Sequence, residues 1–402
     1  MPIKITIITS IYNKSKYLSD YVQSIKNQTF KDFEVICVDD CSTDDSLKHL
    51  QILVSKDSRF NIIINEENCG LSVSRNKAIE LSKGKYICFL DADDCFVPQA
   101  LEILWETAEK YGVEAVFFSA LEYSEDLKKK LRTIKYKSTY PVCDGKKLIA
   151  LLHDNKEYQS ACGFQLWNLE FLKNNNAYFY PGIYYEDTLF TIQTLIKAKC
   201  VKVIPDTLYI YRQCSSSISH TLGIKQLYSC LVIYDQLSIM SKQNYNDEYI
   251  YNEIIERLHL FKRRIEHIIC IEPENIINVL NYSPYNDLLQ KFVKKRTYPY
   301  IRELLDEEIT KIRLSESVFV YGDGVSAEET VALLSRYQIN ICAIIVSYTV
   351  NYRTWHGYKV IALDDFNSQG LVIISVSKKW KESLEEIFEL KGNDTIFITR
   401  DF

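Results

Sequence analysis

Two pairs of carboxylate side chains follow apolar segments within the first hundred residues of the chain. Asp39 and Asp40 come directly after one such segment, and Asp91 and Asp93 follow another. Carboxylates at the end of a buried strand are costly unless cations or hydrogen-bond donors meet them. Mg²⁺ and Mn²⁺ prefer oxygen ligands, and they are commonly shared between one or two carboxylates and substrate phosphates. The spacing therefore predicts a divalent-metal site that faces a nucleotide.

A guanidinium group could take part in the same chemistry. Arg75 lies on a predicted helix between the two acidic pairs, where its planar donors could bind phosphate or a carboxylate. The alternative is that the acidic residues only cap loops and the helices that follow. An isolated Asp-x-Asp motif is a weak signal. A second acidic pair after an earlier strand makes the metal interpretation stronger.

The elements that would position these residues alternate between strand and helix patterns. Short β-branched and apolar runs predict strands, and the runs between them show helical spacing or acidic first turns. This order implies a parallel sheet covered by helices, with ligands at the carboxyl ends of the strands. The predicted strands are 3–9, 33–38, 61–64 and 85–90, and the predicted helices are 17–25, 42–53 and 72–82.

The rest of the chain predicts two further domains. Mixed helix and strand patterns, with a polar excursion at 122–139, complete a first domain at 1–220. Residues 221–314 have mainly helical patterns. A fresh strand-helix-strand pattern then predicts a small Rossmann-like α/β domain at 315–402.

The C-terminal domain opens with a glycine-containing turn. Gly322, Gly324 and Ala327 have the G-x-G-x-x-A spacing of dinucleotide-binding turns. However, the next predicted strand, 341–346, is not followed by the acidic residue that would bind a ribose. We therefore expect this domain to serve packing or partner contact in preference to nucleotide binding or redox catalysis.

Composition excludes several classes of protein. The chain has 402 residues, a net charge of −5 and 47% hydrophobic residues, which is typical of a globular protein of two or three domains. The acidic balance disfavours nucleic acid as a partner, because that binding depends on Lys and Arg at phosphates. No apolar run approaches the roughly 20 residues that span a bilayer. Strand-like sequence from Ile3 onward leaves no room for a signal peptide.

Cysteine usage favours a cytoplasmic location. The 12 cysteines include no C-x-x-C pair, so reduced thiols are expected. Peripheral contact with the inner face of the cell membrane, through Lys128–Lys130, is left open, as is a homo-oligomer.

Six segments resemble motifs of one enzyme family, the family 2 glycosyltransferases, which have the GT-A fold. The earlier ones are ITIITSIYN at 5–13, FEVICVDDCSTDDS at 33–46, NCGLSVSRNKAI at 68–79 and YICFLDADD at 86–94. Two more, GIYYEDTLF at 182–190 and YIYRQCSSSISH at 209–220, match later motifs of bacterial members. The resemblance covers residues 3–220. It implies an α/β domain with a parallel-dominated mixed sheet between helices.

The resemblance also implies roles for individual residues. Asp39 would recognise the nucleotide base with support from Asp40, Asp91 would face the ribose, and Asp93 would hold the metal together with Asp91. His220 would complete the metal shell or touch the diphosphate, unless it is structural, and Arg212 would contact phosphate or brace the site. The nucleotide sugar is expected to lie against Thr9, Ile11, Tyr12, Asn13, Asp39, Asp40, Arg75, Asp91, Ala92 and Asp93.

Asp187 matches the catalytic base of the family. Transfer with inversion needs a carboxylate that takes the proton of an acceptor hydroxyl opposite the departing diphosphate. Asp187 stands 94 residues after Asp93, so it can approach from another side. Glu186 is expected to orient it or cap a helix, and is the second choice of base. Two acids that merely favour a helix N-terminus are the alternative.

We therefore expect an inverting glycosyltransferase that uses a nucleoside-diphosphate sugar, with UDP as the expected nucleotide and Mn²⁺ or Mg²⁺ as the cofactor. The acceptor would be a glycan or a lipid-linked molecule of bacterial capsule- or lipopolysaccharide-type synthesis. The alternatives are a nucleotidyltransferase on a related sheet, an inactive glycan-binding scaffold, and a dehydrogenase built on the C-terminal turn. A nucleotidyltransferase would want a Gly-rich basic loop after the first strand, where this chain has Thr9–Asn13.

Overall fold

The computed structural model describes residues 2–137, 140–214, 223–271, 284–294, 304–322, 325–347, 354–355, 357–376 and 381–398. Contacts divide the chain into two compact units, unit 1 (Met1–His259) and unit 2 (Leu260–Phe402). The three-domain division at 1–220, 221–314 and 315–402 stays a prediction.

Unit 1 is built around one mixed sheet. Its strands are β1 (Ile5–Ile11), β2 (Phe33–Asp39), β3 (Phe60–Ile64), β4 (Tyr86–Phe89), β5 (Cys95–Phe96), β6 (Ala115–Ser124), β7 (Lys130–Ile134), β8 (Gln165–Asn168) and β9 (Val201–Gln213). Their order is β3-β2-β1-β4-β8-β6-β9-β5, with β7 paired to β6. β1 lies between β2 and β4 and is parallel to both, whereas β8 is antiparallel to β4 and β6.

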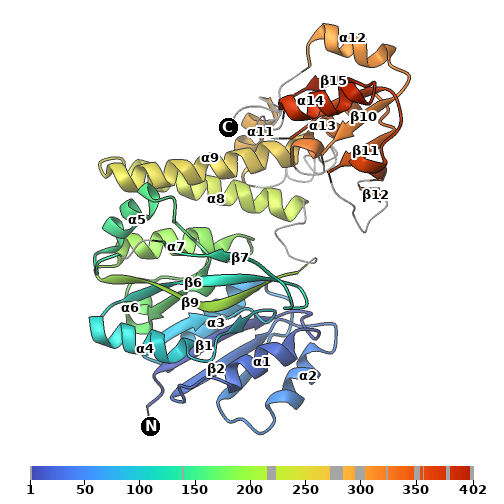
Figure 1. The fold of residues 1–402 in the computed structure, drawn as a ribbon. Coiled ribbons are helices and arrows are strands. Elements are labelled where there is room, and N and C mark those ends of the chain that lie inside the picture. Colours follow the sequence, from blue (N-terminus) through green and yellow to red (C-terminus); the bar gives the residue numbers. More distant parts are fainter. Residues whose placement is uncertain are drawn as a thin grey trace. The chain divides into compact units, whose positions relative to one another are not determined.

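Helices cover both faces of this sheet (Figure 1). The helices are α1 (Leu18–Lys26), α2 (Ser46–Val54), α3 (Leu71–Leu81), α4 (Ala100–Tyr111), α5 (Gly145–Asp154), α6 (Leu169–Asn174), α7 (Glu186–Lys197), α8 (Ile224–Gln243) and α9 (Glu248–Ile271). Of these, α8 packs on α7 and not on the sheet, and α9 runs into unit 2. Side chains alternate along a strand, so Ile5 and Ile7 of β1 share one face, where they join the core cluster that contains Tyr21 and Ile25 of α1. The opposite face contacts α3.

The α/β pattern predicted for the first hundred residues is confirmed. The four predicted strands and α1–α3 are present, with ends displaced by a few residues. The predicted excursion at 122–139 contains the exposed strand β7, although Tyr136 is buried. Residues 138–139 lie outside the described residues.

Unit 2 carries a smaller sheet. Its strands are β10 (Val318–Tyr321), β11 (Ala343–Val346), β12 (Thr354–Trp355), β13 (Tyr358–Ala362), β14 (Leu371–Ile374) and β15 (Asp394–Phe397), in the order β12-β13-β11-β10-β14-β15. Its further helices are α11 (Asn286–Lys294), α12 (Asp306–Leu314), α13 (Val325–Arg336) and α14 (Lys381–Leu390). β10 lies between β11 and β14, parallel to both.

Gly322, after β10, is required by close packing. Its φ is +123°, and a Cβ there would lie 2.9 Å from the carbonyl oxygen of Ser375, which follows β14. This glycine of the predicted turn therefore packs against the neighbouring strand end. Asp323 and Gly324 lie outside the described residues.

Among the helices described, none combines the length and the apolar character needed to cross a bilayer. The cysteines resolved in the described part of the chain are free thiols. Cytoplasmic location, peripheral membrane contact and homo-oligomer formation stay predictions.

Candidate active site

The acidic pairs predicted from the sequence meet at one edge of the sheet of unit 1. Asp39 ends β2 and pairs with Ile11, the last residue of β1. β4 runs parallel to β1, so Asp91 and Asp93, which follow it, come to the same edge. This is the carboxyl edge, where parallel sheets commonly bind ligands.

A buried arginine joins this edge to α7. Arg75, on α3, is 4% exposed. One guanidinium nitrogen donates to Asp91 Oδ1 at 2.8 Å, and another donates to Glu186 Oε1 at 2.6 Å. The aromatic rings of Phe89 and Phe179 lie 5.8 and 5.2 Å from the guanidinium carbon. Arg75 therefore assembles residues that are far apart in the chain.

Asp187 stands beside this cluster in the first turn of α7. The preceding residue, Tyr185, has a left-handed backbone with φ of +60°. That conformation costs a non-glycine residue about 1–2 kcal/mol. Glu186 points inward to Arg75 and is buried, whereas Asp187 is half-buried.

The electrostatics of this pair favour Asp187 as a base. Burial raises the pKa of Asp187 to about 7, the charge of Glu186 adds to the rise, and Arg75 partly offsets it. Burial also raises the pKa of Glu186, against the charge of Arg75. A carboxyl group whose pKa lies near the working pH is suited to general base catalysis. Glu186 is less suited, because its carboxylate is engaged by Arg75.

Asp93, the predicted metal ligand, is contacted by a lysine that no motif in the sequence marks. Lys14 Nζ donates to Asp93 Oδ2 at 2.5 Å. Although burial favours the neutral amine, the charge of Asp93 and this hydrogen bond hold the pKa of Lys14 above its usual value. In the described part of the chain, the second carboxylate oxygen of each residue, Asp93 Oδ1 and Asp91 Oδ2, accepts no hydrogen bond. Carboxylate oxygens are the ligands that Mg²⁺ and Mn²⁺ prefer, and here they would compete with the ammonium group of Lys14, so the metal stays a prediction.

Arg212 braces the loop after β4. Its Nε donates to the Asp93 carbonyl at 2.8 Å, Nη1 to the Glu125 carbonyl at 2.7 Å, and Nη2 to Asp20 Oδ2 at 2.7 Å. Its backbone N–H donates to Asp94 Oδ1 at 2.7 Å. Each guanidinium nitrogen thus has a protein partner, which supports the bracing role over phosphate contact.

A second bracing residue was missed by the sequence reasoning. Tyr209 Oη donates to Asp94 Oδ2 at 2.7 Å and accepts from the Asp91 N–H at 3.3 Å. The pKa of Asp94 is raised well above its usual range, because this carboxyl group is buried and lies beside Asp93 and Asp91. Tyr209 opens the motif at 209–220, but its role could not be read from the motif, since its contact arises from the pairing of β9 with β5.

The loop after β2 has one unpartnered acceptor. Asp40 accepts hydrogen bonds of 2.8 and 2.9 Å from residues 65–70, which lead into α3. Asp39 Oδ2 accepts from the Ser42 N–H at 3.1 Å. Asp39 Oδ1 is buried and has no partner among the described residues. A buried acceptor without a donor is costly, so this oxygen is suited to a donor supplied by a ligand.

The remaining predicted contacts differ in accessibility. Asn13, with φ of +53°, accepts from the Thr43 N–H at 2.8 Å and ties the first two loops together, and the neighbouring Tyr12 is 44% exposed. The side chains of Thr9, Ile11 and Ala92 are buried, so a nucleotide sugar could contact only their backbone. His220 lies outside the described residues. All the contacts with the nucleotide sugar stay predictions.

Two curated relatives share parts of the sequence. A Bacillus subtilis protein, TuaG, named as a candidate teichuronic acid biosynthesis glycosyltransferase, is 42% identical over 98 residues, which are 24% of this chain and 39% of that protein. The poly(ribitol-phosphate) beta-glucosyltransferase of Bacillus spizizenii is 32% identical over 52% of this chain and 32% of its own length. The chain thus spans well under two thirds of either relative.

Solved structures and a family model agree with the motifs. The crystal structure of S. aureus TarS in complex with UDP-GlcNAc is 20% identical, covers 73% of this chain and 88% of that chain, and has a TM-score of 0.56. This likeness confirms the predicted fold. The sequence model of glycosyl transferase family 2 matches residues 6–167. This part of the chain is therefore a domain of glycosyltransferase family 2, as its motifs predicted.

Proposed function

We propose that the protein is an inverting, metal-dependent glycosyltransferase that moves a sugar from a UDP-sugar to a hydroxyl group of a glycan or lipid-linked acceptor. The observation that carries the proposal is the cluster at the carboxyl edge of unit 1. There Asp187, with a pKa of about 7, stands next to the Glu186–Arg75–Asp91 ion pairs. The family 2 domain at residues 6–167 supports the same reaction class.

Asp187 acts as the general base. The acceptor hydroxyl gives its proton to the Asp187 carboxylate while its oxygen forms a bond to the anomeric carbon of the donor sugar. The bond between that carbon and the diphosphate oxygen breaks, and UDP leaves with the electron pair. Attack from the side opposite the leaving group inverts the anomeric centre. Arg75 holds Glu186 out of this reaction.

The carboxyl edge also has groups that would bind the nucleotide sugar. Asp93 and Asp91 would hold Mg²⁺ or Mn²⁺, which stabilises charge on a departing diphosphate. Lys14, bonded to Asp93, adds a positive charge at the same carboxylate. Asp39 offers its unpartnered Oδ1 to an N–H donor of the base.

The relatives support this choice of donor and acceptor. TarS was crystallised with UDP-GlcNAc, which favours a UDP-sugar. The two curated relatives are named for teichuronic acid biosynthesis and for glucosylation of poly(ribitol-phosphate). These names favour an acceptor among bacterial cell-wall polymers, within the wider capsule- or lipopolysaccharide-type expectation.

A thermal-shift screen of the whole chain tests the proposal. A bound donor raises the melting temperature by mass action. We expect a UDP-sugar such as UDP-GlcNAc to raise it with Mn²⁺ present, and a chelator to reduce the shift. Asp93→Asn should reduce the shift as well, whereas the control Asp206→Asn, at an exposed position on β9, should keep it. No shift with any nucleotide sugar contradicts the donor, and an unchanged shift in Asp93→Asn or in chelator contradicts the metal role.

A further inference from the structure

Positive charge is concentrated in one short segment of this acidic chain. Between residues 127 and 143 there is no Asp or Glu, although the whole chain has a net charge of −5. Residues 128–137 form the basic arm, which includes β7. Its cationic residues, all exposed, are Lys128, Lys129, Lys130, Arg132, Lys135 and Lys137.

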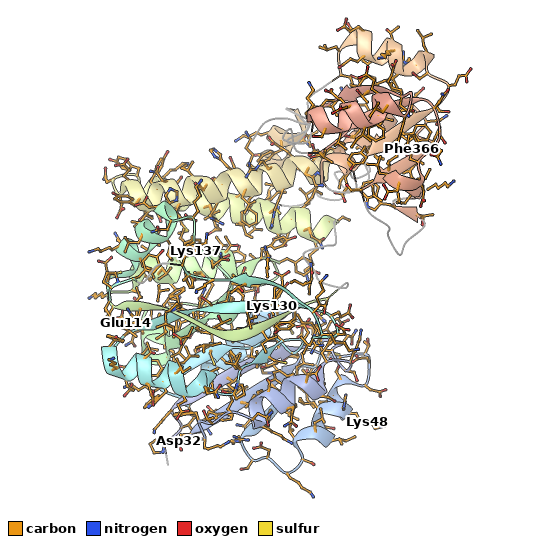
Figure 2. The ribbon with its side chains drawn as sticks, viewed as in Figure 1. Asp32, Lys48, Glu114, Lys130, Lys137 and Phe366 are labelled. Carbon is orange, nitrogen blue, oxygen red and sulfur yellow. The ribbon has the colours of Figure 1, made fainter. Side chains whose placement is uncertain are left out.

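Most of this charge has no carboxylate partner. Arg132 contacts Glu122 on β6, and Lys128 Nζ lies 3.7 Å from Asp126. The other four make no ion pair with any residue in the described ranges. β7 itself is exposed along almost its whole length, so the arm presents a row of cations to solvent. Figure 2 labels two of its members, Lys130 and Lys137.

The arm begins close to the candidate active site. Tyr123 of β6 pairs with Lys130 of β7 on one side and with Arg212 of β9 on the other. A strand spacing of about 4.8 Å places the backbone of Lys130 roughly 10 Å from that of Arg212. Arg212 in turn bonds the carbonyl groups of Asp93 and of Glu125, which precedes the arm. One side chain thus ties the base of the arm to the loop of the predicted metal ligand.

We propose that the basic arm binds an anionic acceptor chain and leads its end toward Asp187. This inference rests on the proposed function and assigns a chemical class to its acceptor. Five residues of β7 extend over about 17 Å, which suits repeated negative charges better than a single anion. Exposed cations of one sign raise the local concentration of a polyanion and speed its encounter.

Two other uses of exposed lysines need to be separated from this one. Lysines on an edge strand can prevent pairing with another chain, and basic clusters can bind anionic lipid. Membrane-surface segments usually combine basic residues with a bulky apolar face. In the described part of the arm, Leu131 is 40% exposed and Tyr136 is buried. One partly exposed leucine does not make a bulky apolar face, so a polyanionic chain is favoured over a lipid surface as the occupant.

The test compares two triple variants of the whole protein. K128Q/K129Q/K130Q neutralises the start of the arm, and K48Q/K56Q/K83Q removes the same charge from exposed lysines elsewhere in unit 1. The probes are polygalacturonate and inorganic polyphosphate as polyanions, dextran as a neutral chain, and phosphatidylglycerol vesicles as an anionic surface. We expect the arm variant to bind the polyanions about tenfold more weakly, and the control variant to bind them like wild type. Salt should weaken polyanion binding by wild type, and dextran should not bind.

Two results would overturn the proposal. One is equal polyanion affinity in wild type and the arm variant, and if that variant also aggregates, the lysines are assigned to protection of the β7 edge. The other is a loss of binding confined to the vesicles, which would assign the arm to a membrane. Release of UDP from the UDP-sugar is measured without acceptor in every variant. Its absence in wild type would count against the proposed function and not against the arm.

Discussion

The two sheets of the molecule share a strand arrangement but differ in the residues that follow the strands. In unit 1, β1 lies between β2 and β4, and in unit 2, β10 lies between β11 and β14, all in parallel. After these three strands unit 1 has Asp39, Asp91 and Asp93, whereas unit 2 has Gly322, Ser347 and Ser375 in the described residues. The aspartates Asp364 and Asp365 of unit 2 follow β13, which lies outside this group of three strands.

The polar groups at the two edges are also satisfied differently. In unit 2, Tyr321 Oη and Ser347 Oγ lie 2.5 Å apart, and Ser375 Oγ lies 2.7 Å from Thr330 Oγ1. In unit 1, Asp39 Oδ1 has no partner among the described residues. Strand order is therefore shared, while the chemistry depends on the residues that follow the strands. The comparison supports packing or partner contact for the C-terminal domain, which stays a prediction.

Among the variants that test this difference between the two sheets, Asp187→Asn is expected to have the largest effect, which is on the rate of sugar transfer. An asparagine cannot accept the proton of the acceptor hydroxyl, so transfer should fall by roughly 10²–10⁴-fold while donor binding persists. Steady-state kinetics and donor titration measure the two quantities. Asp144→Asn is the matched control, because Asp144 is the exposed N-cap of α5 and should leave kcat unchanged. A similar loss in both variants would point to helix capping and not to base catalysis.

Arg75→Met should destabilise unit 1 strongly. The change leaves the buried Glu186 carboxylate without its partner, which costs about 3–5 kcal/mol for a buried ion pair. Urea denaturation gives the free energy of unfolding. Arg59→Met removes the partly exposed ion pair with Asp57 and should cost about 1 kcal/mol or less. Equal losses of unfolding free energy in the two variants would show that the buried ion pair stabilises the protein no more than the partly exposed one.

The raised pKa of Asp187 predicts two pH dependences of opposite sign. Below its value of about 7, kcat should rise about tenfold per pH unit, because only the ionised carboxylate accepts a proton. Stability should change the other way. The ordinary value is 3.8, so the native state binds more protons than the unfolded state between these two values. The free energy of unfolding of wild type relative to Asp187→Asn should therefore fall as pH rises from about 4 to 7. A pH-independent difference would mean that the pKa is not raised.

The smallest effect is expected in unit 2, from Gly322→Ala. The added Cβ would meet the Ser375 carbonyl at 2.9 Å, so we expect a loss of about 1–3 kcal/mol with unchanged kcat. Gly357→Ala separates the causes, because Gly357 has a φ of +83° but no atom within 4 Å of a Cβ. It should cost only the backbone strain, about 1 kcal/mol. A fall of kcat in Gly322→Ala would contradict the difference between the two sheets, because it would show that unit 2 contributes to sugar transfer.

The carboxyl edge could be predicted because it depends on local order. A buried strand followed by aspartates places them at its end, as for Asp39 and Asp91. The contacts across the edge could not be predicted in this way. Arg75 and Glu186 are 111 residues apart, and periodicity says nothing of their ion pair.

Backbone conformation was the second feature that could not be predicted from the sequence. Cys41 and Tyr185 adopt left-handed φ values of +61° and +60°, which their residue types disfavour. Only the packing of the whole unit can impose such conformations. Lys14 was missed for a related reason, because the loop that holds Asn13 with φ of +53° also carries Lys14 toward Asp93.

Hydrogen–deuterium exchange of the whole chain, with and without UDP and Mn²⁺, tests most directly where the donor binds. We predict that the ligands slow exchange of backbone amides in residues 9–15, 39–46 and 89–96, and leave residues 318–347 unchanged. Slower exchange confined to residues 318–347, or none in the three segments of unit 1, would contradict a donor site at the carboxyl edge of β1, β2 and β4.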